Sequence, residues 1–431
     1  MSNLFSNYLA YTAETEPPII YHRWSYLTTL GAAIGRKTYL HHGHWRVFPT
    51  LYIMLLGEPA ARKSTSIKMA KKLFAAAGYT NFSADKSTKE KFLLDLEGTE
   101  GQELGDEDEL TSNGRSRRKV DSIDASSLWG DERKEPREVF IVADEFNEFA
   151  GAGNMEFYTT LGNLWDFDSP SAPFTQRVKN SRSVSIHQPT ISILSGNTPE
   201  LFARAFPPEA IGSGFLSRLM LVHGERSGRK ITFPPPPDPK IEEGLIAYLV
   251  QLQNYEGGAL EIAPAAKALL DTLYQHETDY LISDIRFKGF NNRRFTQLLK
   301  LCVLITGAQF KKEIQEEDVF LANTILSHAE ILMPKAMGEF GKNKNSDVSN
   351  KIVTIIEKAN RPVATRELWM QVSRDLGAQK DLMDLLNGLL AADRLQVVQG
   401  RHPGFLPKKV PRKEHKWVDW TLLTQEERDM I

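Results

Sequence analysis

The sequence contains a single cysteine, Cys302, among its 431 residues. One thiol cannot form a disulfide framework or a multi-thiolate zinc site, and such cysteine usage predicts a reducing compartment. Long apolar runs are also missing, since no stretch approaches the roughly 18 apolar residues that a membrane-spanning helix needs. The start of the sequence has no charged segment followed by an apolar one, as a secretory signal would have. We therefore expect a cytoplasmic protein with no membrane partner.

An excess of positive charge is absent as well. Lys and Arg total 53 against 55 Asp and Glu, a formal net charge of -2, which excludes a uniformly basic nucleic-acid coat and leaves only local basic patches. The sequence is 41% apolar and 25% charged, as in ordinary globular proteins. A chain of this length predicts two or three domains.

Residues 51–65 predict an apolar strand, a phosphate-binding loop and the start of a helix. The loop pattern G-x-x-x-x-G-K-[ST] wraps phosphates with backbone N–H groups, and its Lys and hydroxyl serve the terminal phosphates and Mg²⁺. Arg62 replaces the second glycine of this pattern, where the backbone normally turns tightly. Either the turn has an ordinary φ, or Arg62 reaches a phosphate or an adjacent subunit. The expected nucleotide-binding residues are Gly57, Glu58, Pro59, Ala60, Ala61, Arg62, Lys63, Ser64 and Thr65.

Two carboxylates end a second apolar strand, at residues 139–145. Strands that alternate with helices predict an α/β fold with a mostly parallel sheet, whose ligands bind at the carboxyl ends of the strands. Asp144, on a strand expected to neighbour the loop strand, could hold Mg²⁺ with Ser64. Glu145 could polarise the water that attacks ATP. The alternative is a strand that simply ends in surface acids.

Asn197 and Arg218 complete the expected catalytic set. Asn197 ends the next apolar strand, where it could bind the γ-phosphate or the attacking water, or merely cap a loop. Arg218 precedes the strand at residues 219–222. There it could stabilise charge on the nucleotide of a neighbouring subunit, which implies a ring or another oligomer, or it could form a surface salt bridge.

Composition divides the chain into segments. The proline-rich residues 233–239 mark a boundary, because no helix or central strand could contain them. Residues 240–340 are expected to be helical throughout. Three helices and a two-stranded hairpin then predict a winged helix, which could contact DNA or protein. The expected segments are a helical lead-in (1–47), a phosphate-loop core (48–232) with a mobile acidic insertion (97–138), a helical lid (233–340), the winged helix (346–410) and a C-terminal tail (411–431).

Basic clusters are the candidate DNA contacts. A hairpin at residues 175–187 carries Arg177, Lys179 and Arg182, which could bind backbone phosphates without base selectivity or could be solvated charges. Residues 113–119 form a second basic cluster, for which the same two interpretations stand. The lysines at 68, 71 and 72 predict a solvated face of the first helix after the loop.

The order of phosphate loop, Asp-Glu strand, Asn-ended strand and arginine resembles AAA+ ATPases. More narrowly, residues 15–335 are similar to phage and prophage replication ATPases related to superfamily 3 helicases. That resemblance implies an ATP- and Mg²⁺-dependent DNA helicase or translocase, a ring that is most often a hexamer, a basic pore hairpin and a primase partner. It also suggests Arg293 or Arg294 as the sensor 2 residue of the lid. The alternative is a nucleotide-gated initiator or helicase loader that binds DNA without unwinding it.

Overall fold

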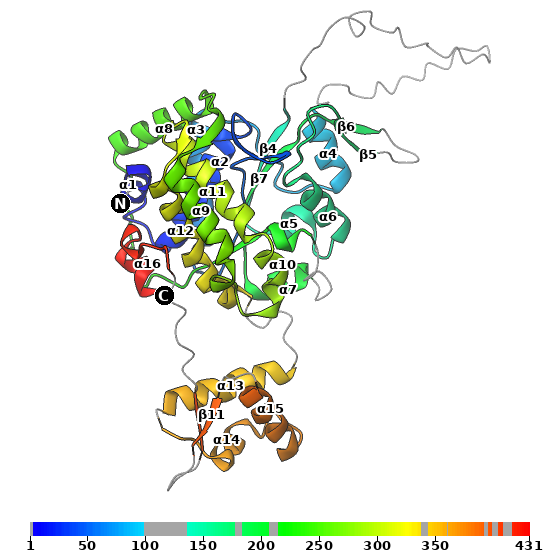
Figure 1. Ribbon diagram of the computed structural model, residues 1–431, viewed down its shortest axis with the longest axis vertical. Coiled ribbons are helices and arrows are strands. Elements are labelled where there is room, and N and C mark those ends of the chain that lie inside the picture. The colour runs from blue at the N-terminus through cyan, green and yellow to red at the C-terminus, as the bar shows by residue number, and fades with distance from the viewer. Residues whose placement is uncertain are drawn as a thin grey trace, which may run out of the picture.

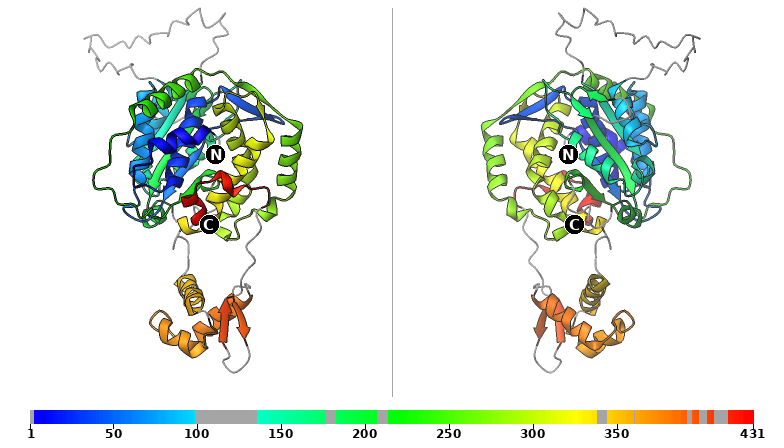
Figure 2. Two further views of the ribbon diagram at one scale, coloured as in Figure 1. Left: turned by 90° about the vertical axis from the view of Figure 1, so that its left-hand side faces the viewer. Right: turned by 90° about the vertical axis from the view of Figure 1, so that its right-hand side faces the viewer.

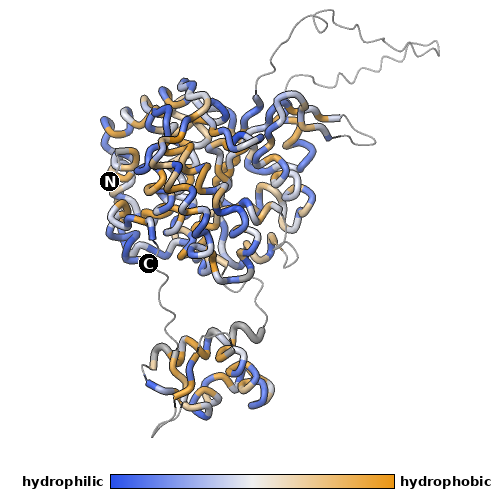
Figure 3. The backbone as a smooth tube through the Cα atoms, viewed as in Figure 1, coloured by the Kyte–Doolittle hydropathy of each residue, from blue (hydrophilic) through white to orange (hydrophobic). Residues whose placement is uncertain are grey.

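The computed structural model shows one main body and a smaller C-terminal unit (Figure 1). The main body has a single continuous hydrophobic core that runs from Phe5 to Met337 and takes in Leu423 near the end of the chain. Apolar segments fill its interior and hydrophilic ones its periphery (Figure 3). The structure describes residues 3–98, 136–176, 183–206, 214–337, 344–359, 361–391, 395–398, 404–407 and 416–431.

A parallel four-stranded sheet forms the centre of the main body, as the sequence predicted. Its strands are almost wholly buried, which fits their apolar sequences, because helices cover both faces of a parallel sheet. One expectation was wrong in detail: the strand before Asp144 is not next to the loop strand, since the Asn197 strand lies between them. The order is β4 (Glu138–Ala143), β7 (Thr190–Asn197), β3 (Tyr52–Leu56) and β8 (Met220–His223).

A second sheet corrects two further expectations. It joins β1 (Thr38–His42) and β2 (Trp45–Val47) to β9 (Gly258–Ile262) and β10 (Glu313–Ile314). Residues 240–340 are therefore not helical throughout, and residues 38–47 of the expected helical lead-in form two strands. In the case of β9 the physical reason is local: a short alternating run lies between Gly258, at φ +70°, and the helix-starting Pro264, too short for a helix.

Helices pack around the first sheet. In α2 (Ile19–Ile34) every residue after Ile19 is buried, so this helix lies inside the body. Figure 2 shows the yellow-green to yellow helices gathered on one side of the body and the blue-to-green sheet on the other. The remaining helices of residues 3–337 are α1 (Asn3–Tyr11), α3 (Lys63–Ala76), α4 (Lys89–Glu97), α5 (Phe146–Ala150), α6 (Met155–Leu164), α7 (Pro199–Ala205), α8 (Pro239–Gln253), α9 (Pro264–Gln275), α10 (Lys288–Asn291), α11 (Arg294–Ala308) and α12 (Glu316–Ala336). No described helix has the length and apolar character needed to cross a membrane.

The C-terminal unit has the predicted order of elements: three helices and then an antiparallel hairpin. A separate hydrophobic cluster, which includes Ile352, Leu368 and Leu386, forms its core. Residues 341–343, which precede the unit, and residues 401–403, which lie between the strands of its hairpin, are outside the described residues. The elements are α13 (Lys344–Ala359), α14 (Thr365–Val372), α15 (Gln379–Ala391), β11 (Leu395–Val398) and β12 (Gly404–Pro407).

Residues 416–431, expected as a tail, pack against the main body. Their last helix, α16 (Gln425–Asp429), places Glu427 in a buried ion pair with Arg23 of α2, with N–O distances of 2.5 and 2.6 Å. Both side chains are almost completely buried, at 0% and 1% exposure. Burial alone would raise the pKa of Glu427, but the charge of Arg23 and its hydrogen bonds lower it below the ordinary value. This contact is therefore complete at neutral pH and is lost as acid protonates Glu427 through its lowered pKa.

We predict that Glu427→Gln lowers the free energy of unfolding by about 3 kcal/mol, because it leaves the Arg23 charge buried and uncompensated. Glu426→Gln is the matched control. Glu426 is partly exposed, and a glutamine oxygen can still accept the Ile19 N–H, so a loss below about 1 kcal/mol is expected. Urea unfolding of both variants measures the difference. Equal midpoints would show that the buried pair does not hold the C-terminal segment.

Candidate functional site

The predicted phosphate loop leaves the carboxyl end of β3 at Gly57. A Cβ there would lie 2.3 Å from the Tyr21 hydroxyl and 2.5 Å from the carbonyl oxygen of Gly224. The Tyr21 hydroxyl itself lies 2.8 Å from the carbonyl oxygens of Leu56 and Gly224. Glycine is thus required by close packing at this position, and α2 braces the start of the loop.

Arg62 has a left-handed backbone, with φ 63° and ψ 26°. Of the alternatives for this residue, an ordinary φ is therefore wrong. Its Nε donates a hydrogen bond of 2.6 Å to a carboxylate oxygen of Glu16. Ala60 is also left-handed, at φ 62°. Each such residue carries a backbone cost of about 1–2 kcal/mol that glycine would not.

Lys63 is folded back over the loop in this structure. Its Nζ donates hydrogen bonds to the carbonyl oxygens of Gly57, at 2.7 Å, and Glu58, at 3.0 Å. Burial lowers the pKa of Lys63, and the charges of Glu145 and Glu200 partly oppose this effect. The residue begins α3, whose N-terminus no side chain caps. The first N–H groups of that helix, with its positive dipole end, therefore face the loop and favour an anion.

Strand ends bring the acidic and amide side chains to the same place. Asp144 and Glu145 follow β4, and Asn197 ends β7. At Gly196 a Cβ would lie 2.6 Å from the carbonyl oxygen of Asp144, so a glycine is needed for these two strand ends to approach. The resulting cleft, of about 340 Å³, is lined by Pro59, Ala60, Arg62, Lys63, Ser64, Thr65, Asp144, Glu145, Asn197 and Thr198.

A lysine of α3 enters this site unpredicted. Lys68 lies 2.6 Å from a carboxylate oxygen of Asp144, and its side chain is 67% exposed. The hydrogen bond and the charge of Asp144 raise the pKa of Lys68. The two neighbouring lysines of the expected solvated face, Lys71 and Lys72, also lie near carboxylates, at 3.5 and 3.7 Å. No sequence signal separates Lys68 from these two, because only the fold places Asp144 beside it.

Asn197 is almost fully buried and caps the end of its own strand. Its Oδ1 accepts the N–H of Thr198 at 3.1 Å, and its Nδ2 donates to Oδ1 of Asn147 at 3.3 Å. Asn147 lies on α5, two residues after Glu145, and donates in turn to the carbonyl oxygen of Leu201. This second asparagine, which sequence reasoning missed, fixes the amide that faces the cleft.

The three candidate arginines lie away from this cleft. Arg218 ends a short 3-10 helix, Leu216–Arg218, directly before β8. Because β8 runs parallel to β3, Arg218 lies at the opposite end of the sheet from the loop. Arg218 and Arg293 both approach the Trp165 indole, at 5.7 and 5.8 Å from its centroid.

Arg294 is buried within the helices of the lid. Its Nε lies 3.0 Å from a carboxylate oxygen of Glu330, and its guanidinium group also donates to Asn323 and Ser327. Burial raises the pKa of Glu330 to about 7, although Arg294 opposes the rise. Neither Arg293 nor Arg294 lines the cleft. In this arrangement neither is therefore placed to contact a nucleotide there, as a sensor 2 residue would.

The candidate DNA contacts fall largely outside the described residues. The predicted hairpin is present in its two strands, since β5 (Phe174–Gln176) pairs antiparallel with β6 (Val184–Ile186). Its basic residues Arg177, Lys179 and Arg182 lie outside the described part of the chain, as does the cluster at 113–119 and nearly all of the acidic insertion.

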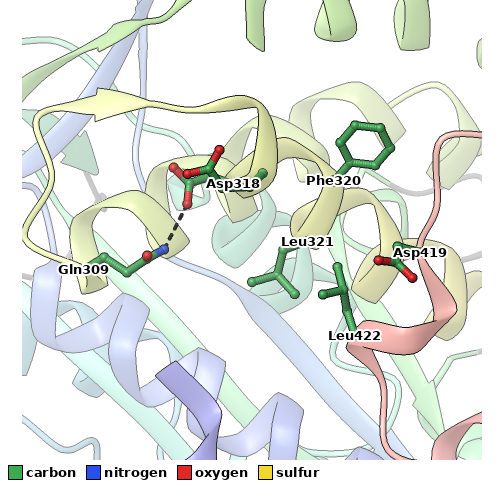
Figure 4. A pocket seen from close by; sticks show the side chains of 7 residues that line it. Gln309, Asp318, Phe320, Leu321, Asp419 and Leu422 are labelled. Atoms are coloured by element: carbon green, nitrogen blue, oxygen red, sulfur yellow. Dashed lines mark hydrogen bonds between the residues drawn. The ribbon is translucent and has the colours of Figure 1, made fainter. Parts of the chain in front are cut away.

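A second cavity, of about 440 Å³, lies where the C-terminal segment meets α12 (Figure 4). Leu321 of α12 and Leu422 form an apolar wall there, and Asp318 accepts a hydrogen bond from Gln309 at 2.9 Å. None of its lining residues lines the loop cleft. Within the described ranges, no group of three or more His, Cys, Asp or Glu side chains is placed to hold a metal ion.

Comparison with known proteins adds no assignment. No family model matches the sequence, and no curated protein matches it.

We predict that Arg62→Gly gives a more stable protein than Arg62→Ala, by about 1 kcal/mol. Both variants remove the ion pair with Glu16, but only glycine adopts the left-handed backbone without a Cβ clash. The alanine variant is thus the matched control, and the urea midpoints of the two variants measure the difference. If they unfold at the same urea concentration, the backbone of residue 62 carries no strain.

Proposed function

We propose that this protein is an ATP-dependent DNA helicase or translocase of phage or prophage replication, which works as a ring. One observation carries the proposal: a phosphate-type loop, an uncapped helix N-terminus and the Asp144/Glu145 pair line a single cleft. That combination suits hydrolysis of a nucleoside triphosphate. The DNA substrate and the ring rest on the resemblance to AAA+ replication ATPases.

In this proposal each side chain of the cleft has a distinct task. Lys63 and the first N–H groups of α3 bind the phosphates, for which Lys63 leaves the carbonyl oxygens of the loop. Glu145 takes a proton from the attacking water, and Asn197 positions that water or the terminal phosphate. The helix N-terminus is already oriented for this, so binding needs little rearrangement of the backbone.

The cleft also offers a fitting site for Mg²⁺. The Ser64 hydroxyl and the Asp144 carboxylate both line it, and Mg²⁺ binds through one or two such oxygens together with substrate phosphates. When bound, the ion would neutralise charge on the phosphates. In this structure Lys68 forms an ion pair with the Asp144 carboxylate. Because the Lys68 side chain is two-thirds exposed, it can turn into solvent and leave Asp144 available to the ion.

Arg218 supports the ring. It lies at the far end of the sheet from the cleft of its own chain, so a role in hydrolysis requires that it reach the nucleotide of a neighbouring copy. An arginine supplied in trans stabilises charge that develops on the transferred phosphate. A closed ring, most often a hexamer in the family that this chain resembles, would place every such arginine at a neighbour's site.

The second candidate is an initiator or helicase loader, which would bind nucleotide and DNA without unwinding. Arg62 in place of a glycine and the near-neutral charge favour it. Strand displacement on a forked duplex separates the two candidates: a helicase releases the displaced strand when ATP is present, whereas a loader binds the fork and leaves it paired.

We predict that Lys63→Ala abolishes ATP hydrolysis, because it removes the lysine of the phosphate loop that lines the cleft. Lys71→Ala, on the same helix but away from the cleft, removes an ion pair with the exposed Asp85; it is the control and should retain the wild-type rate. Release of inorganic phosphate measures both variants. Hydrolysis that survives in the Lys63 variant would show that the loop is not the nucleotide site.

We further predict that mixing two inactive variants, Lys63→Ala and Arg218→Ala, restores part of the DNA-stimulated ATPase activity. Interfaces in which one chain keeps Lys63 and its neighbour keeps Arg218 are complete only if Arg218 acts in trans. Phosphate release from each variant alone and from the mixture measures the effect. A protein that stays monomeric with ATP and single-stranded DNA, and shows no DNA-stimulated hydrolysis, would contradict the ring.

A further inference from the structure

Glu16 lies between α1 and α2 and is held by three hydrogen bonds. One carboxylate oxygen accepts the Arg62 Nε at 2.6 Å, and the other accepts the N–H of Ile231 at 3.1 Å. Its backbone carbonyl oxygen accepts the Ser227 hydroxyl. These contacts fix the carboxylate in position beside the phosphate loop, 46 residues before the arginine that it binds.

The ion pair between Arg62 and Glu16 stands where two cavities meet. One is the loop cleft, and the other, of about 220 Å³, has Glu16 in its wall. Arg62 and Ala60 line both cavities. The 220 Å³ cavity is strongly basic, because its described lining residues include Arg62, Arg226, Arg229 and Lys230 but Glu16 as the one acid.

Two of those arginines already donate hydrogen bonds to backbone carbonyl oxygens. Arg226 donates to the carbonyl oxygen of Pro59, and Arg229 to those of Ala13 and Pro17. Arg62 differs because, among the residues that the structure describes, its side chain bonds only to the Glu16 carboxylate. It is therefore the guanidinium group of this region that can change partner without breaking a contact to the backbone.

We propose that Arg62 is a phosphate ligand of the nucleotide, and that Glu16 competes with the nucleotide for it. This inference rests on the proposed function, since it concerns the same cleft. In the absence of nucleotide, Glu16 compensates the charge of Arg62. A nucleotide phosphate then takes the place of the carboxylate, because guanidinium groups bind phosphate with two parallel hydrogen bonds. In this proposal Arg62, with its left-handed backbone, stands where the loop pattern has a glycine because its guanidinium group binds a phosphate of the nucleotide.

Breaking the ion pair between Arg62 and Glu16 costs little free energy. The Arg62 side chain is 54% exposed and that of Glu16 23%, and exposed ion pairs are weak. Glu16 also keeps the Ile231 N–H after Arg62 leaves. That backbone hydrogen bond is the largest single cause that lowers the pKa of Glu16, ahead of the hydrogen bond from Arg62, so the carboxylate keeps an N–H partner that favours its ionised form.

Calorimetric titration of the full chain with ADP and with inorganic pyrophosphate tests the proposal. The variants are Glu16→Gln, Arg62→Gly and the double variant, with Glu14→Gln as the control for charge. Glu14 is exposed, and its side chain has no hydrogen bond or ion pair within the described part of the chain. A glutamine at position 16 can still accept the Ile231 N–H, so the variant changes only the competition for Arg62 and one charge.

We expect Glu16→Gln to tighten binding of both ligands about two- to fivefold, the range that one exposed ion pair sets. Arg62→Gly should weaken binding, and Glu16→Gln should have no further effect in its background. An equal gain in both backgrounds would show that Glu16 acts by its own charge, which overturns the exchange. A gain no larger than that of Glu14→Gln overturns it too.

The outcome also separates this inference from the proposed function. If the wild-type protein binds ADP in a Lys63-dependent manner and Glu16→Gln changes nothing, only the exchange is wrong. If neither the wild type nor any variant binds ADP or pyrophosphate, the loop is not a nucleotide site and both proposals are wrong.

Discussion

The candidate site depends on the register of three parallel strands. Leu56 of β3 pairs with Asn197 of β7, and Ala143 of β4 pairs with Ser195. All three strands therefore end at nearly the same level, and whatever follows each strand meets at one edge of the sheet. A shift of two residues in any pair would move a carboxylate or an amide by nearly 7 Å. The chemistry of the cleft is thus set by backbone hydrogen bonds in the core.

Helix α2 contacts both the ends of the strands and the helix that follows the loop, and so holds the loop in place relative to the sheet. It runs through the interior, where Ser25 lies 3.0 Å from Ser66 of α3 and Tyr21 contacts the ends of β3 and β8. The same helix carries Arg23, the partner of Glu427. A single buried helix thus contacts the phosphate loop, the helix after it and the C-terminal segment. The buried polar side chains of Tyr21, Arg23 and Ser25 each have a partner on another element, which fixes the rotation and depth of the helix.

Local sequence patterns predicted the helices and strands, but they did not predict the contacts between segments that are distant in the sequence. Apolar runs located β3, β4 and β7, and the loop motif located the loop residues that line the cleft, because each of these signals lies within a short stretch of the sequence. The pairing of β1 with β9 joins residues more than 200 positions apart. Lys68 with Asp144 and Arg62 with Glu16 are likewise products of the fold. A charged side chain in a sequence does not reveal which of many opposite charges it will face.

The buried pair of Arg23 and Glu427 also determines how the C-terminal unit is joined to the rest. The chain leaves the main body after Met337, forms the unit at 344–407 and returns to the same hydrophobic core at Leu423. In topological terms the unit is an insertion, with its entry and its exit both anchored. A single proteolytic cut in either connection would therefore leave the unit attached to the main body through the other.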